Sequence, residues 1–255
     1  MNVKHLISLV VAAAVLLAVG MPAYASKTDD RIESSAKTSY NFKTYLKEDD
    51  IKIESKNGAV ALTGTVSSES HKSLAQETVA GLPGVKSVDN RLTVKGAPAT
   101  ANSDAWLKEK VHTTLLFHQS VSYAKTEVDV KDGIVTLRGN ATSQAQKDLT
   151  TEYAKDVDGV KDVNNEMTVS KTGKKTPQTT GGKIDDASIT AQVKMTLLYH
   201  RSTSALNTSV TTKRGVVTLS GKAKNAAEKD LAAKFAKDVN GVKSVKNQIT
   251  IEASK

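Results

Sequence analysis

Residues 133–139 read GIVTLRG, and close variants recur as GAVALTG at residues 58–64 and GVVTLSG at residues 215–221. A second landmark keeps the same spacing between its three copies: PGVKSVDNRLTV from Pro83, DGVKDVNNEMTV from Asp158 and NGVKSVKNQITI from Asn240. Two landmarks with identical offsets indicate a repeated domain rather than a repeated short motif. We therefore expect three copies of one small unit, each of about 68 residues.

Two polar segments separate the copies. The units are expected at residues 28–95, 103–170 and 184–252, joined by linkers at residues 96–102 and 171–183. The second linker reads KTGKKTPQTTGGK, and its Gly, Thr and Lys content is typical of a flexible connection.

Each unit contains a predicted β-hairpin. Alternating apolar residues flank a two-residue turn in every copy: Asn57-Gly58, Asp132-Gly133 and Arg214-Gly215. Asn-Gly and Asp-Gly favour the positive φ angles of a type I′ turn. A further glycine interrupts the second strand of each hairpin, where we expect a bulge or the close approach of a helix: Gly64, Gly139 and Gly221.

Helices are expected before and after the hairpin. The second helix has a plausible N-cap residue in each copy: Ser68, Ser143 and Asn225. The first helix is clearest at residues 104–118 and 186–200, whereas Tyr40 and Asn41 replace a Leu pair in the first copy. The predicted order is α-β-β-α-β, an α+β fold in which two helices pack on one face of a three-stranded sheet.

The N-terminus has the features of a secretory signal peptide. Lys4 precedes the apolar run LISLVVAAAVLLAVG, and the small residues of Ala23-Tyr24-Ala25 follow, so we expect residues 1–25 to be removed after Ala25. An uncleaved anchor is the alternative, although the run is short for a membrane span. The chain contains no Cys, which excludes disulfides and acylation as a lipoprotein.

Positive charge is concentrated towards the C-terminus. The net charge is +1 over residues 27–95, −3 over residues 103–170, +4 over residues 171–183 and +6 over residues 184–255. This asymmetry indicates that the last third of the chain prefers an anionic surface.

The repeats resemble the BON domain of the osmotically inducible periplasmic protein Y family. The resemblance rests on the helix ending TLLFH or TLLYH, the hairpin DGIVTLRG, an Ala-rich helix and the ending GVKxVxN before an apolar strand. It implies a location in the periplasm, binding to phospholipid membranes and protection of the envelope during osmotic stress. It also implies a protein that is not an enzyme and has no cofactor.

The residues that could perform chemistry lack the partners that catalysis requires. His118 and His200 occupy equivalent positions, where Lys43 stands in the first copy, and we interpret both as ordinary helix-end residues rather than metal ligands. No nucleophile motif is present. Acidic pairs such as Asp185-Asp186 fit helix capping better than catalysis. We therefore predict no catalytic, metal or cofactor site and no nucleic-acid partner.

Contact with an anionic membrane surface is the predicted activity. Trp106, the only Trp, lies beside two lysines, a combination suited to the lipid headgroup region, although it could instead pack across the end of its own domain. The lysines of the second linker and last unit could equally form a solvated surface. The candidate contacts are Trp106, Lys108, Lys110, Lys171, Lys174, Lys175, Lys183, Lys222, Lys224, Lys229, Lys234 and Lys237.

The sequence thus predicts a periplasmic envelope-maintenance protein that binds anionic phospholipid peripherally through its repeats. A periplasmic chaperone or scaffold is the alternative, because exposed sheet edges could pair with unfolded or secreted proteins.

Overall fold

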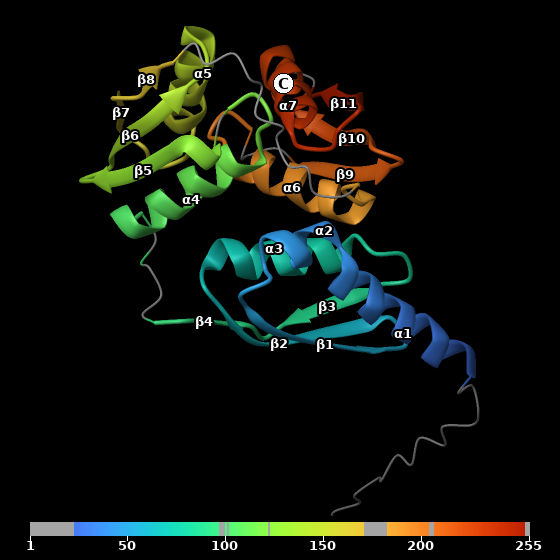
Figure 1. Cartoon of the computed structure of the whole chain (residues 1–255). Coiled ribbons are helices and arrows are strands. Elements are labelled where there is room, and N and C mark those ends of the chain that lie inside the picture. The colour runs from blue at the N-terminus through green and yellow to red at the C-terminus, as the bar shows by residue number, and fades with distance from the viewer. Residues whose placement is uncertain are drawn as a thin grey trace, which may run out of the picture.

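The structure, a computed structural model, describes residues 23–96, 100, 102–121, 123–170, 183–203 and 207–252. Most of the expected signal peptide therefore lies outside the described residues. Figure 1 shows three α/β units with their sheets on the outside of the molecule and their helices between them. Among the residues that the structure describes, none of the helices is both long and apolar enough to cross a bilayer.

The three units repeat the predicted element order. The first contains α1 (Ala23–Thr38), α2 (Tyr40–Thr44), β1 (Asp50–Lys56), β2 (Ala59–Val66), α3 (Glu69–Ala80), β3 (Ser87–Asn90) and β4 (Thr93–Val94). The second contains α4 (Asp104–Phe117), the short 3₁₀ helix η1 (Tyr123–Lys125), β5 (Thr126–Lys131), β6 (Ile134–Ala141), α5 (Gln144–Lys155), β7 (Asp162–Asn165) and β8 (Thr168–Val169). The third contains α6 (Asp186–Tyr199), β9 (Asn207–Lys213), β10 (Val216–Ala223), α7 (Ala226–Asp238) and β11 (Ser244–Ile251).

Each sheet has the second hairpin strand at its centre. In the third unit β10 pairs antiparallel with β9 and parallel with β11, and the other two sheets are built in the same way. An Asn ends the recurring GVKxVxN motif in every copy, and in the third unit Asn247 donates a hydrogen bond to the Lys229 carbonyl in α7. The motif therefore ties the last strand to the preceding helix.

The hairpin turns are type I′, as predicted. Both central residues have positive φ in all three copies, for example 54° at Asp132 and 80° at Gly133. A carboxylate of the preceding helix accepts the backbone N–H groups of each turn. Asp104 bonds to Asp132 and Gly133 in this way, at 2.7 and 2.8 Å. The equivalent carboxylates are Asp29 and Asp186.

The glycine within each second strand has a different role from the one predicted. Gly139 pairs in regular register with Thr126, so the strand has no bulge there. Its φ is 120°, and a Cβ at this position would lie 1.9 Å from the carbonyl oxygen of Lys125. This carbonyl, at the end of η1, therefore excludes any side chain, and the first-strand carbonyls of Asp50 and Asn207 do the same at Gly64 and Gly221.

The helix layers of the three units pack against one another. In α6, 11 of 14 residues are buried, because this helix contacts α7 in its own unit, α4 in the second unit and α3 in the first. The second and third units share one continuous hydrophobic cluster. Phe117 of α4 and Tyr199 of α6 join the core of the first unit. The repeats thus form a joined assembly in which mainly the sheets face outwards.

Candidate functional site

The predicted lipid contacts do not form one surface. Lys171, Lys174 and Lys175 lie outside the described residues. Lys183 precedes α6 and is exposed. The remaining candidate lysines of the third unit lie in both of its layers. Lys222 lies on β10 and Lys224 follows it, whereas Lys229, Lys234 and Lys237 lie on α7.

Trp106 lies where the three units meet. Its half-buried indole packs against the shared core of the second and third units, and the Lys110 ammonium lies 3.8 Å from the ring centroid. Together with Ser70 of α3 and Tyr199 of α6, these two side chains line a cleft of about 240 Å³. Burial lowers the pKa of Lys110, and Asp158 partly offsets this effect. The nearby Lys108 is exposed and pairs with Asp129 at 3.4 Å.

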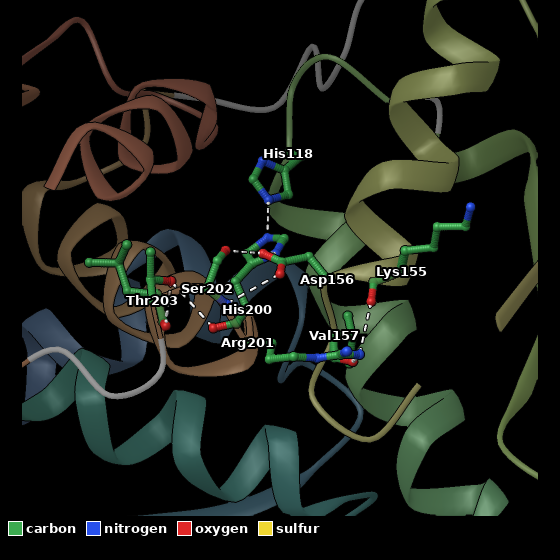
Figure 2. A network of polar contacts seen from close by, with 9 residues as sticks. His118, Lys155, Asp156, Val157, His200, Arg201, Ser202 and Thr203 are labelled. Atoms are coloured by element: carbon green, nitrogen blue, oxygen red, sulfur yellow. Dashed lines mark hydrogen bonds and ion pairs between the residues drawn. The ribbon is translucent and has the colours of Figure 1, made fainter. Parts of the chain in front are cut away.

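Two histidines join the second and third units. His118 follows α4 and His200 follows α6, both are fully buried, and their Nε2 atoms lie 3.0 Å apart. Both are the C-cap residues of their helices, as expected, but their burial and their contact with each other were not predicted. Figure 2 shows the two imidazoles facing each other, with Asp156 and Ser202 beside His200.

The contacts around this histidine pair are reciprocal. His118 Nδ1 lies 3.1 Å from Asp238 of the third unit, and His200 Nδ1 lies 3.0 Å from Asp156 of the second. Each imidazole also stacks on an α5 or α7 ring, with centroids 3.9 Å apart for His118 on Tyr153 and 4.0 Å apart for His200 on Phe235. The equivalent positions of two repeats thus meet across an approximate twofold relation.

This network holds a defined number of protons. One Nε2–Nε2 contact and two Nδ1–carboxylate contacts require three hydrogens, whereas two neutral imidazoles carry only two. When all three bonds are made, the pair therefore bears one positive charge beside two carboxylates. A fourth proton would place two N–H groups against each other at the 3.0 Å contact.

The pKa shifts of the two carboxylates favour their ionised forms, whereas that of His118 opposes a positive charge on the imidazole. Burial lowers the pKa of His118, while its hydrogen bond to Asp238 opposes this effect. Burial alone would raise the pKa of Asp238, but hydrogen bonds from His118, Ser120 and Tyr153 outweigh it and lower the pKa. Asp156 behaves in the same way, because His200 and Ser202 donate to it. The site stabilises the docked arrangement of two domains, and no group of three or more His, Asp or Glu among the described residues could hold a metal ion.

A second polar contact docks the first unit onto the third. Asn41 is fully buried, its Nδ2 donates to Thr78 Oγ1 at 2.8 Å, and its Oδ1 accepts from Gln192 Nε2 at 2.8 Å. Its backbone N–H donates to Ser188 Oγ at the start of α6. The helix expected here is divided at Ser39, which caps α2, so that Asn41 reaches α6.

Both docking contacts escaped prediction because they join different units. One signal was available for each: the first copy has Lys43 where the others have His118 and His200, and Asn41 where they have Leu. At these positions the residue type differs between copies, and the residues contact different neighbouring units. The turn carboxylates could also have been found, since Asp29, Asp104 and Asp186 each precede the turn glycine by the same interval.

The BON domain profile matches residues 28–96, 103–171 and 185–253. The chain belongs to the BON domain family. It is 34% identical over 148 residues to osmotically-inducible protein Y of Escherichia coli (strain K12), covering 57% of this chain and 71% of the relative. It is also 34% identical over 109 residues to the outer membrane lipoprotein DolP of Haemophilus influenzae, covering 42% of this chain and 56% of that protein.

Among solved structures, CdsD of the Chlamydia trachomatis type III secretion system aligns over 88% of this chain and 91% of its own. Its identity is 17% and the TM-score is 0.25, so this likeness carries no functional argument.

Proposed function

We propose that this BON-domain protein acts in the periplasm to maintain the cell envelope under osmotic or related stress, by binding anionic phospholipid surfaces peripherally. The relatives support the setting, because one is named for osmotic induction and another for the outer membrane. The observation that carries the membrane contact is the +6 charge of residues 184–255, where the other two units have +1 and −3. Export would depend on the expected signal peptide.

The buried polar groups of the histidine pair and of Asn41 join one domain to another, and this structural role is compatible with a binding protein. The charged surface of the third unit therefore carries the proposal. A lipid contact by Trp106 would require its indole to move out of the cleft that it lines.

Cosedimentation of the mature chain with vesicles tests this function. We expect binding to phosphatidylcholine vesicles that contain about 30% phosphatidylglycerol, and much weaker binding to phosphatidylcholine alone, because lysines are attracted to anionic headgroups. Equal binding to both vesicles, or to neither, would contradict the proposal.

A chaperone or scaffold role is the second candidate. Its support is that the strands flanking the centre of each sheet, such as β9 and β11, have an unpaired edge among the described residues and could accept a strand from a client. Suppression of aggregation of an unfolded client by the purified protein, without lipid, would favour this role.

A further inference from the structure

The open face of the third unit's sheet has an unusual composition. Burial alternates along β9, so that Thr208, Val210 and Thr212 point inwards and their neighbours point outwards. The same alternation and the strand register define the outward residues of the whole sheet: Asn207, Ser209, Thr211, Lys213, Val216, Thr218, Ser220, Lys222, Ser244, Lys246, Gln248 and Thr250. This set holds three lysines, six hydroxyl groups and no carboxylate; Glu252 follows one residue after β11.

The matching faces of the other two units are of mixed charge. The first exposes the acidic residues Asp50, Glu54 and Asp89, and the second exposes Glu127, Asp129 and Asp162. Two arginines there pair with carboxylates, since Arg91 contacts Asp89 and Arg138 contacts Glu166 at 2.9 Å, while Lys52, Lys56 and Lys131 share these faces with the acidic residues. Repetition of the fold therefore does not explain the uniform charge of the third face.

The lysines of the third face stand without carboxylate partners. Among the described residues, the ion pairs found include none with Lys213, Lys222 or Lys246. The register places Lys213 beside Val216, Lys246 beside Thr218 and Lys222 beside Thr250, so the three charges spread from one end of the sheet to the other. Small hydroxyl side chains between them leave the surface without bulky projections.

We propose that this open face of β9, β10 and β11 is the surface that docks on anionic phospholipid headgroups. The inference rests on the proposed function and names its contact surface. Unpaired lysines attract the phosphate groups of the bilayer, and the hydroxyl groups between them supply donors to the same oxygens. The helix layer offers a less uniform surface, because α6 is covered by the other units and α7 exposes the carboxylate of Asp230 beside its lysines.

Matched charge reversals on the two layers of the third unit test the proposal. Lys213→Glu/Lys246→Glu changes the sheet face, and Lys229→Glu/Lys234→Glu changes α7 by the same net charge. In the full mature chain, we expect the sheet-face variant to bind vesicles containing phosphatidylglycerol at least about tenfold more weakly, and the helix variant to lose less than about twofold. Lys213→Gln/Lys246→Gln, with a smaller change of charge, should give an intermediate loss.

The outcomes separate the two proposals. If the unmodified chain does not bind these vesicles, the proposed function fails and the docking surface fails with it. If the chain binds but the sheet-face variant keeps its affinity, or both variants lose affinity equally, the docking surface is wrong while membrane binding stands. Thermal melting of each variant establishes that any loss comes from a folded protein; a sheet-face variant that unfolds is replaced by the Gln variant, and retention of binding by that variant overturns the inference.

Discussion

At the residue scale, one position of the repeat has different roles in different copies. His118 and His200 complete the junction between the second and third units, whereas Lys43 at the same place leaves the first unit outside it. A buried polar network of this kind is stabilising only while every member has its partner. Its proton count therefore governs whether the two units stay docked.

Acid should separate these two units. Burial lowers the pKa of His118 below 6.5 in the docked state, whereas the same histidine in separated units takes up its proton near the ordinary value of 6.5. The titratable groups in contact with the pair are Asp156, Asp238 and Tyr153. The separated state then binds more protons, so docking is stable above about pH 6.5 and weakens as the pH falls below it.

Small-angle scattering or energy transfer between labels on the two units measures this opening. The variant His118→Gln/His200→Gln should lose most of the pH dependence, whereas His71→Gln, which lies outside the junction, should retain it. An inter-unit distance that stays constant from about pH 7.5 to about pH 5 would refute the role of the histidine pair.

At the element scale, a single carboxylate fastens each first helix to its hairpin. Asp104 accepts both N–H groups of the turn at Asp132-Gly133, and hydrogen bonds to a charged group contribute more than neutral ones. Asp104→Ala should lower the free energy of unfolding by about 1–3 kcal/mol, measured by denaturant titration. Asp129→Ala, which removes only an exposed partner of Lys108, should cost less than about 0.5 kcal/mol. Equal effects of the two changes would count against the clamp.

The elements themselves were largely predictable, because their signals are local. The turn residues of the hairpins and the caps at Ser68, Ser143 and Asn225 all act within a few residues of their own position. The role of Gly139 was missed because the excluding atom, the carbonyl oxygen of Lys125, belongs to a different segment of the chain. Predicting that the candidate lysines divide between two layers would also have required the register of β9, β10 and β11, which only the folded sheet provides.

At the scale of the whole molecule, the three repeats act as one body because their helix layers are shared. Asn41 illustrates how departure from the repeat creates this arrangement, since Leu at that position could not satisfy Thr78 and Gln192. Asn41→Leu should remove the acceptor of the buried Gln192 amide and loosen the first unit from α6. Limited proteolysis should then cleave the first linker faster than in the unmodified chain, while Lys43→Leu, on a neighbouring helix position, should not change the rate. Unchanged cleavage of the Asn41 variant would contradict this docking role.

The charged groups on the open sheet face of the third unit are all positive, and we expect this face to orient the assembly on a membrane. Because α6 is covered by contacts between units, we expect membrane binding to depend on outward lysines of the sheet, whose attraction is screened by salt. The most direct test is the affinity of the mature chain for vesicles containing phosphatidylglycerol, measured from about 50 mM to about 300 mM salt. The account predicts that affinity falls at least about tenfold over this range. An affinity that does not change with salt would contradict it.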